Sequence, residues 1–304
     1  MEKYLSESSD IGITRENRRL YIVSAGEDTI LGYDEDLNLS DAINLKSSAK
    51  IQPKRIAWLN GYLYTANSAD GSICKINALT KEIKRVSVCP YPTDIVAADK
   101  RIIICCGETD TILSLDEGLN VINAVPACSF PISMAIDSKK QKLAAACLYN
   151  KKIRIYDTKT LEHIDEIDLK EYPNAVAFMD EFILAACSEE GYLTQGNFHF
   201  IKDGSILKSI KVNKMPSCVC VASNGNIFVA NTGNRSVDII SSKEKKLIKR
   251  IQTPEMPDFL INFNKGVYLS CIIDGYLIRM DEDGNIQKKI RTLSEPRGMC
   301  IASL

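Results

Sequence analysis

The chain has 304 residues, 45% of them hydrophobic and 25% charged, and its 38 Lys and Arg against 39 Asp and Glu leave a net charge of −1. This balance gives no electrostatic drive toward nucleic acid or an anionic membrane, so we expect neither as a partner. The length is near the limit for one hydrophobic core, which indicates two domains or one repeat array.

Residues 1–14 show no basic segment followed by an apolar one, and no stretch approaches the roughly eighteen apolar residues of a membrane span. We therefore expect a soluble protein of the cytoplasm. The chain has eleven cysteines. Because this number is odd, at least one is free, and in that compartment reduced thiols are favoured over a disulfide framework.

Seven prolines recur at intervals of 39 to 43 residues, and each opens a short apolar run. They are Pro53, Pro92, Pro131, Pro173, Pro216, Pro257 and Pro296. The whole chain has only ten prolines, so chance is a poor explanation for seven in phase. A period of this length is the signature of a repeat architecture.

Each unit contains four short runs in a fixed order. The run that begins at the proline comes first, and a second run follows a polar turn. A tight turn leads to a third run, such as ILGYD from Ile30, and a fourth, such as IKRVSV from Ile83, completes the unit. The second runs begin, in chain order, at Leu20, Leu63, Ile102, Leu143, Ile183, Ile227 and Val267. Short apolar runs bounded by Gly, Asp and Asn are typical of strands.

Seven units of four strands predict an all-β fold, a seven-bladed β-propeller that occupies residues 1–304 as a single domain. The runs are nearly continuous in apolar residues because neighbouring blades cover both faces of each blade. Two segments could supply the innermost strand of the first blade, namely 10–14 and 296–304. We expect MCIASL, residues 299–304, to pair there, so that both chain ends close the ring.

Some runs carry a family resemblance. LYTAN from Leu63, IFVAN from Ile227 and IRIYDTKTLEHIDEI from Ile153 resemble the repeats of the YVTN or YncE-like seven-bladed propellers, over essentially the whole chain. The resemblance implies the fold, and functions that range over binding modules, surface proteins and relatives of lactone hydrolases. Two features depart from it. The asparagine that ends the second run is present only at Asn67 and Asn231, and the fifth unit is irregular after Leu193.

One repeat position holds, in chain order, Ser24, Asn67, Cys106, Cys147, Cys187, Asn231 and Cys271. In adjacent blades these positions would lie about 8 to 9 Å apart, too far for a disulfide or a shared zinc ion. We therefore interpret these cysteines as small buried apolar residues. Cys105 and Cys106 should face opposite sides of one strand. Cys218 and Cys220, with Cys300 in the same register, are the alternative candidates for a partial metal or redox site.

Catalytic signatures are scarce, because the sequence lacks a nucleophile elbow, an H-E-x-x-H motif, a P-loop and a dinucleotide fingerprint. His163 begins a fourth run and is interpreted as an exposed polar residue. His199 lies in the irregular segment between Phe198 and Phe200, where surface packing on a loop is favoured over catalysis. The sequence therefore indicates no catalytic residue, metal or cofactor, although a calcium site of carboxylates and asparagine stays open.

The candidate ligand-binding residues follow the repeat prolines. There the start of each innermost strand and the end of the second strand meet at the mouth of the central channel. The candidates are Lys54, Arg55, Asp94, Asn174, Asp258 and Arg297. A basic patch flanked by carboxylates could hold a carboxylate, a phosphate or an acidic peptide through charge-assisted hydrogen bonds. A mutually neutralised, solvated rim is the alternative.

Two classes of function remain. We favour a monomeric, non-catalytic propeller that presents the channel mouth to a protein or a small anionic ligand, since such scaffolds carry variable loops on a rigid ring. The alternative is a lactonase-like enzyme that acts on a small cyclic ester, with Asp94 and Asp258 as acid and base and with or without a divalent ion. Fold analogy is most of the support for this alternative.

Overall fold

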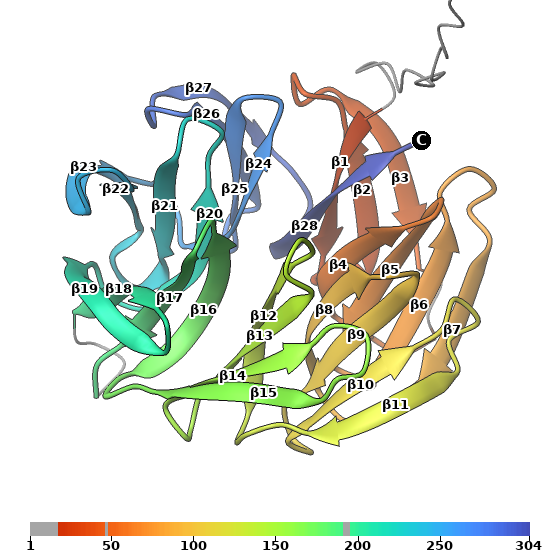
Figure 1. Ribbon diagram of the computed structural model, residues 1–304. Coiled ribbons are helices and arrows are strands. Elements are labelled where there is room, and N and C mark those ends of the chain that lie inside the picture. Colours follow the sequence, from red (N-terminus) through yellow and green to blue (C-terminus); the bar gives the residue numbers. More distant parts are fainter. Residues whose placement is uncertain (1–17, 46–47, 191–194) are drawn as a thin grey trace, which may run out of the picture.

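The computed structural model describes residues 18–45, 48–190 and 195–304. Seven four-stranded antiparallel sheets stand around one axis as blades, which confirms the predicted all-β seven-bladed propeller (Figure 1). The innermost strands are β28 (Pro296–Ser303), β4 (Pro53–Leu59), β8 (Pro92–Ala98), β12 (Pro131–Asp137), β16 (Tyr172–Met179), β20 (Pro216–Val221) and β24 (Pro257–Phe263). No helix of the described residues is long and apolar enough to cross a membrane.

The other strands follow outward in each blade. The second strands are β1 (Arg18–Ser24), β5 (Tyr62–Asn67), β9 (Arg101–Cys106), β13 (Lys142–Cys147), β17 (Phe182–Ser188), β21 (Asn226–Asn231) and β25 (Gly266–Cys271). The third strands are β2 (Thr29–Tyr33), β6 (Ser72–Asn77), β10 (Thr111–Leu115), β14 (Lys152–Asp157), β18 (Gly196–Lys202), β22 (Ser236–Ser241) and β26 (Tyr276–Asp281). The outer strands are β3 (Leu39–Asn44), β7 (Ile83–Ser87), β11 (Val121–Pro126), β15 (His163–Asp168), β19 (Ser205–Val212), β23 (Lys246–Gln252) and β27 (Ile286–Arg291). One 3-10 turn, η2 (Thr232–Asn234), follows β21.

The carboxyl-terminal strand closes the ring. β28 pairs antiparallel with β1, with Leu20 opposite Ile301 and Tyr21 opposite Cys300. Figure 1 shows β28 between β4 and β24, which belong to the second and the last blade. The expectation that the carboxyl terminus completes the first blade is therefore confirmed. The competing segment, 10–14, lies outside the described residues.

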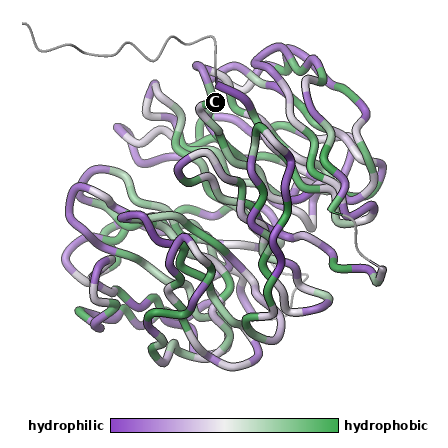
Figure 2. The backbone as a smooth tube through the Cα atoms, turned by 90° about the vertical axis from the view of Figure 1, so that its right-hand side faces the viewer, coloured by the Kyte–Doolittle hydropathy of each residue, from purple (hydrophilic) through white to green (hydrophobic). Residues whose placement is uncertain are grey.

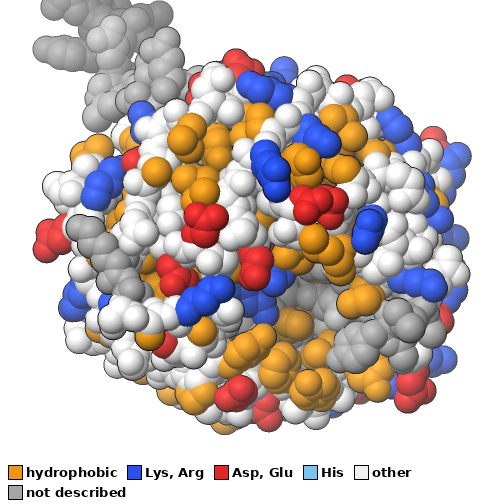
Figure 3. Space-filling view, turned by 180° about the vertical axis from the view of Figure 1, so that it is seen from behind, with side chains coloured by type: hydrophobic (Ala, Val, Ile, Leu, Met, Phe, Trp, Pro, Cys, Tyr) orange, Lys and Arg blue, Asp and Glu red, His pale blue; other side chains and the backbone are white. Residues whose placement is uncertain are grey.

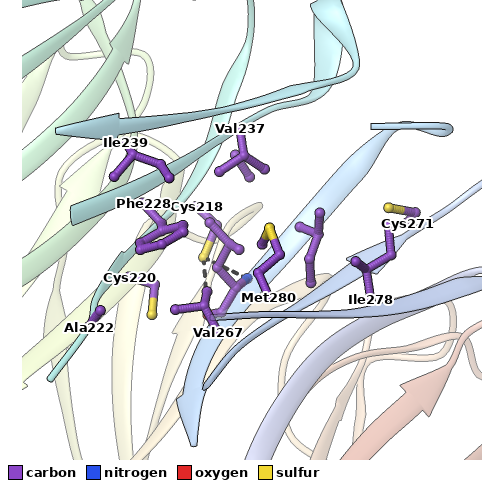
Figure 4. Packing of buried hydrophobic residues seen from close by; sticks show 13 residues of the cluster. Cys218, Cys220, Ala222, Phe228, Val237, Ile239, Val267, Cys271, Ile278 and Met280 are labelled. Carbon is purple, nitrogen blue, oxygen red and sulfur yellow. Dashed lines mark hydrogen bonds between the residues drawn. The ribbon is translucent and has the colours of Figure 1, made fainter. Parts of the chain in front are cut away.

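The hydrophobic core consists of seven clusters, one in each gap between neighbouring blades. Figure 4 shows the cluster between the blades of β20 and β24, where Phe228 and Met280 are fully buried. Figure 2 shows the hydrophobic stretches of the chain along the strands and hydrophilic stretches at many of the turns. A strand in the middle of a blade contributes to two clusters, so its residues are apolar at successive positions rather than alternate ones.

Strand β9 illustrates this two-sided burial and shows where its two adjacent cysteines lie. Ile104 and Cys106 pack into the cluster shared with the preceding blade. Ile103 and Cys105 pack into the cluster shared with the following blade. The two cysteines therefore lie on opposite faces of the strand, as predicted, and both are fully buried.

The expectation of reduced thiols throughout is wrong, because the structure contains two disulfides. Cys106 pairs with Cys89 at a Cα–Cα distance of 6.0 Å, and Cys147 pairs with Cys128 at 5.5 Å. Both partners lie three residues before a repeat proline, in the connection that leads into the innermost strand. The geometric argument considered only equivalent positions in adjacent blades, which indeed do not pair, and overlooked this connection. Cys187 has a lysine at the corresponding place, Lys170, and remains free.

The other cysteines behave as small buried apolar residues. All seven free cysteines are buried. The backbone N–H of Leu260 donates to Sγ of Cys218 at 3.3 Å (Figure 4). Burial is the main cause that raises the pKa of Cys218 to about 12, so its thiol is protonated at neutral pH. Across the described parts of the chain, no three His, Cys, Asp or Glu side chains form a group that could hold a metal ion.

The fifth blade is more regular than expected. His199, predicted on a loop, lies on strand β18 and is only 1% exposed. The prediction failed because both faces of this strand are buried, so Phe198 and Phe200 enter one cluster while His199 faces the other way. Its Nδ1 lies 2.9 Å from Oγ of Ser209, and its Nε2 lies 3.4 Å from the Glu171 carboxylate. Burial, the largest effect, lowers the pKa of His199.

This group has the order of a Ser–His–carboxylate triad, but none of its members lines the channel or the pocket at its mouth. We interpret this group as a structural contact that joins strands β18 and β19 to the segment that leads into β16. His163, by contrast, begins β15 and is exposed, as predicted.

We predict that an alkylating reagent modifies seven cysteines of the unfolded, unreduced protein. Prior reduction should make four more cysteines reactive. The native protein should resist a water-soluble alkylating reagent, because every free thiol is buried. Intact-mass spectrometry counts the added groups. Each disulfide closes a loop of 17 or 19 residues, so reduction should cost about 3 kcal/mol of stability per bond. Eleven reactive thiols without reduction would contradict the assignment.

Candidate functional site

The backbone at the channel mouth repeats one irregularity in all seven blades. In β4, Pro53 pairs with Asn67 and Arg55 pairs with Ala66, so Lys54 is an extra residue in the ladder. The same β-bulge follows the repeat proline in every innermost strand. A bulge bends its strand and re-aims the side chains beside it. Around the ring, the two residues after each proline line two levels of the channel mouth, and some of them line both.

The upper level is a pocket of about 200 Å³ at the mouth. Six of its lining residues come directly after a repeat proline, namely Lys54, Ile132, Asn174, Ser217, Asp258 and Arg297. The lower level is the channel itself, about 430 Å³, and most residues one position further on line it: Arg55, Asp94, Ser133, Ala175, Cys218 and Phe259. Figure 3 shows one face of the ring, hollowed near its centre, with basic and acidic side chains around the hollow.

The structure brings five of the six predicted residues together. Lys54, Arg55, Asn174, Asp258 and Arg297 all line the mouth pocket. The sixth, Asp94, lines only the channel below it. Arg55 and Ser217 line both spaces, so they lie where the pocket meets the channel. The repeat register therefore predicted which residues gather at the channel mouth.

Asp258 is the centre of the charged group. One of its oxygens accepts a hydrogen bond from Nη1 of Arg55 and the other from Nη1 of Arg297, both at 3.2 Å. Burial by itself would raise the pKa of Asp258. The two arginines and Lys54 outweigh burial, so the pKa lies below its ordinary value. The guanidinium of Arg55 also lies 5.0 Å from the centroid of the Phe259 ring, a cation–π contact that holds it over the channel.

Lys54 has no carboxylate partner. Its Nζ lies 5.2 Å from the centroid of the Tyr91 ring and makes no ion pair with any described residue. Burial, followed by the charge of Arg55, lowers the pKa of Lys54 from 10.5 to about 8. Because the folded state disfavours the charged amine, this residue reduces stability at neutral pH, and stability is regained as the pH rises from about 8 to 10.5.

The remaining two predicted residues are held by local hydrogen bonds. Asp94 accepts from the backbone N–H of Ile95 at 2.9 Å and of Met134 at 2.6 Å. Burial nevertheless raises its pKa, because Arg55 and these donors only partly offset it. Asn174 donates from Nδ2 to Oγ of Ser188 at 2.6 Å. Neither carboxylate of the predicted acid–base pair is therefore free of a strong partner.

Gly298 makes room for this arrangement. A Cβ atom built on it would lie 2.9 Å from Cα of Arg55 and 3.0 Å from the carbonyl oxygen of Lys54. These are backbone atoms of the neighbouring blade, so they cannot move aside as the end of a side chain would. Glycine thus lets β28 approach β4 at the seam of the ring and places Arg297 beside Lys54 and Arg55.

Several lining residues were not predicted. Ser188 and Thr232 line the mouth pocket; Ser188 is the last residue of second strand β17, and Thr232 directly follows second strand β21. The repeat register contains the signal that would have found them, because those strand ends and the prolines share one rim. Ser217 and Ile132 follow repeat prolines but were not chosen, since their side chains carry no charge. A larger hollow of about 520 Å³ lies on the same rim. Its lining includes Asp70 and Glu108 and contains no Lys or Arg.

Comparison with solved structures shows the fold alone. The structure is similar to Kuenenia stuttgartiensis hydrazine synthase, with a TM-score of 0.74 and 14% identity over 90% of this chain and 92% of that one. It is similar to a functionally unknown protein from Desulfotomaculum acetoxidans DSM 771, with a TM-score of 0.75 and 13% identity over 93% and 98% of the two chains. BamB from Moraxella catarrhalis gives a TM-score of 0.64 and 12% identity over 91% and 86%. No family model and no curated protein matches the sequence.

We predict that Asp258→Asn lowers the free energy of unfolding by about 3 kcal/mol, because two half-buried arginines lose their common counter-charge. The midpoint of urea unfolding measures the change. Since the pKa of Asp258 is depressed, the difference from the parent should persist at neutral pH and disappear only as the pH falls below about 4. The exposed Asp203→Asn is the control and should change little. Equal stability of both variants would refute the central role of Asp258.

We predict that Gly298→Ala costs about 1 to 3 kcal/mol, because the added methyl group meets backbone atoms that cannot move without separating β28 from β4. Gly266→Ala is a matched comparison, since its nearest neighbour would be a side-chain atom of Tyr268 at 3.3 Å. Urea unfolding should give a clearly lower free energy of unfolding for Gly298→Ala than for Gly266→Ala. The opposite order would show that the seam tolerates a side chain at this position.

Proposed function

We propose that this propeller is a non-catalytic binding protein that takes a small anion, a carboxylate or a phosphate, in the pocket at its channel mouth. One observation carries the proposal. The lining contains three cations, Lys54, Arg55 and Arg297, and only one carboxylate, Asp258. At neutral pH the pocket therefore has an excess of positive charge in partly dehydrated surroundings, where an anion is strongly favoured.

The cations also have hydrogen-bond donors to spare. Both arginines use Nη1 for Asp258, while Nε and Nη2 of each guanidinium make no hydrogen bond to the described residues. A guanidinium offers five N–H donors in a planar fork that matches carboxylate and phosphate oxygens. Ser188 and Thr232 also line this pocket, although the Thr232 hydroxyl already donates to the carbonyl oxygen of Pro257 at 2.7 Å. A pocket of about 200 Å³ has the volume of roughly six or seven waters, which suits a small metabolite.

The wider assignment is part of the same proposal. We propose a monomeric binding module related to the YVTN or YncE-like propellers, on the strength of the repeats that resemble theirs. A protein partner that presents an acidic side chain would meet the same cations. The cytoplasmic location expected from the sequence stays a prediction, and the two disulfides weigh against it because such bonds persist mainly in oxidising compartments.

The lactonase-like alternative gains no support from the site. Asp258 is paired with two arginines, and both oxygens of Asp94 accept backbone hydrogen bonds. A general base needs a lone pair within reach of the substrate proton. Each oxygen of both carboxylates already accepts one hydrogen bond within the protein, and we do not assign these carboxylates acid–base roles.

Isothermal titration calorimetry with inorganic phosphate and with succinate, at low ionic strength, tests the binding proposal. We expect saturable binding that weakens as salt is added. Arg297→Gln should reduce the affinity about tenfold, since it removes one charge-assisted contact. Lys151→Gln is the control, because Lys151 lies outside the pocket lining and should leave binding unchanged. Absence of binding by both anions, or equal binding by Arg297→Gln, would overturn the proposal.

A further inference from the structure

Lys54 differs from the two arginines beside it. It is the extra residue of the β4 bulge, and its amine is the only one in the lining of the mouth pocket. Its Nζ makes no hydrogen bond or ion pair with the described residues, and its one polar contact is with the face of the Tyr91 ring. A surface lysine would be solvated and mobile. Lys54 is instead held between an aromatic ring and a pocket without an acidic partner of its own.

The surroundings of Lys54 make its amine easier to deprotonate than that of an ordinary lysine. Burial and the nearby guanidinium of Arg55 both disfavour its positive charge, and Arg297 adds to the effect. Asp258 acts in the opposite direction, but it is shared by the two arginines. A lysine that is desolvated or placed next to another cation has a lowered pKa, and its neutral amine can attack a carbonyl carbon. The site therefore combines a nucleophilic amine with cations that hold a carboxylate.

We propose that Lys54 forms a reversible imine with small carboxylates that carry an aldehyde or ketone group, while Arg55 and Arg297 hold the carboxylate. This inference rests on the proposed anion-binding function and names its ligand class. The lone pair of the Lys54 amine attacks the carbonyl carbon, and the carbonyl oxygen leaves as water with the two amine hydrogens. The product is a carbon–nitrogen double bond, and no oxidant or reductant is consumed.

Size and donor placement support this ligand class. A 2-oxo acid has its carbonyl directly next to its carboxylate, so both groups fit in a pocket of about 200 Å³ that contains an amine and two guanidiniums. Lys54 and Arg55 are adjacent in the chain, and the bulge lets both line this pocket. A regular strand would direct them to opposite faces. The bulge thus supplies the juxtaposition that the chemistry requires.

Reductive trapping tests the proposal. The protein is incubated with glyoxylate or pyruvate and sodium cyanoborohydride at pH 8, and the modified lysine is located by peptide mass mapping. With a pKa of about 8, about half of Lys54 is neutral at this pH, against well under one in a hundred for an ordinary lysine. We therefore expect Lys54 to be labelled at least about tenfold faster than any other lysine.

Lys151 is a matched internal control. Its Nζ lies 4.4 Å from the centroid of Tyr172, which precedes a repeat proline as Tyr91 does, but Lys151 does not line the pocket. Labelling should be lost from position 54 in Lys54→Arg and remain at the background level on Lys151. Glyoxylate should label Lys54 faster than the neutral aldehyde propanal does, and Arg297→Gln should reduce that preference, because the preference depends on the carboxylate contact.

Three failures are distinguishable. If phosphate and succinate bind the parent protein but Lys54 is labelled no faster than Lys151, the imine is refuted and anion binding stands. If neither anion binds, the proposed function itself fails. Labelling of Lys54 without a preference for glyoxylate over propanal would refute the role of the arginines and with it the proposed ligand class.

Discussion

Burial of both faces of every blade is the constraint on which the rest of this structure depends. Each of the seven hydrophobic clusters takes side chains from two neighbouring blades. No blade can therefore bury its apolar side chains alone. The gaps on either side of the first blade are filled only when β28 pairs with β1. β28 meets this need by adding Met299 and Cys300 to the two clusters at the seam. Fully burying one large apolar side chain is worth about 1.5 to 3 kcal/mol, so the closing strand has a large effect on stability.

The mouth of the channel is a consequence of the same geometry. Innermost strands from seven blades converge around the axis, and each has one extra residue after its proline. The backbone is thus nearly identical around the ring, while the side chains differ from blade to blade. Charge is concentrated where Asp258, Arg297 and Lys54 follow one another on adjoining blades, so the seam of the ring is also the candidate binding site.

Within the charged group at the seam, the nearby cations outweigh the burial of Asp258, so its pKa lies below the ordinary value. Lys54 has no carboxylate partner among the described residues, and its pKa is lowered to about 8. The disulfides are placed differently, on the two blades that follow, where they tie the connections before Pro92 and Pro131 to the ends of β9 and β13. The disulfides and the candidate binding pocket therefore lie on different parts of one rim.

The sequence by itself determined the number of blades, the order of strands and the rim where the candidate residues meet. These follow from the repeat prolines and the apolar runs, which are local patterns that recur every 39 to 43 residues. It also placed Lys54, Arg55, Asn174, Asp258 and Arg297 at one mouth, because repeat register converts sequence spacing into position around an axis.

Only the tertiary structure decided the rest, because it depends on contacts between residues of different register. Asp94 lines the channel but not the mouth pocket, although Arg55 at the same repeat position lines both. The pairing of Asp258 with two arginines leaves Lys54 without a carboxylate partner among the described residues, and Gly298 permits the close approach at the seam. The disulfides join a strand end to a connection in the preceding repeat. His199 is buried, and the periodicity of the sequence does not show that both faces of its strand are covered. The partners of these side chains and the extent of their burial are set when the ring closes, and the sequence of a single repeat does not contain that information.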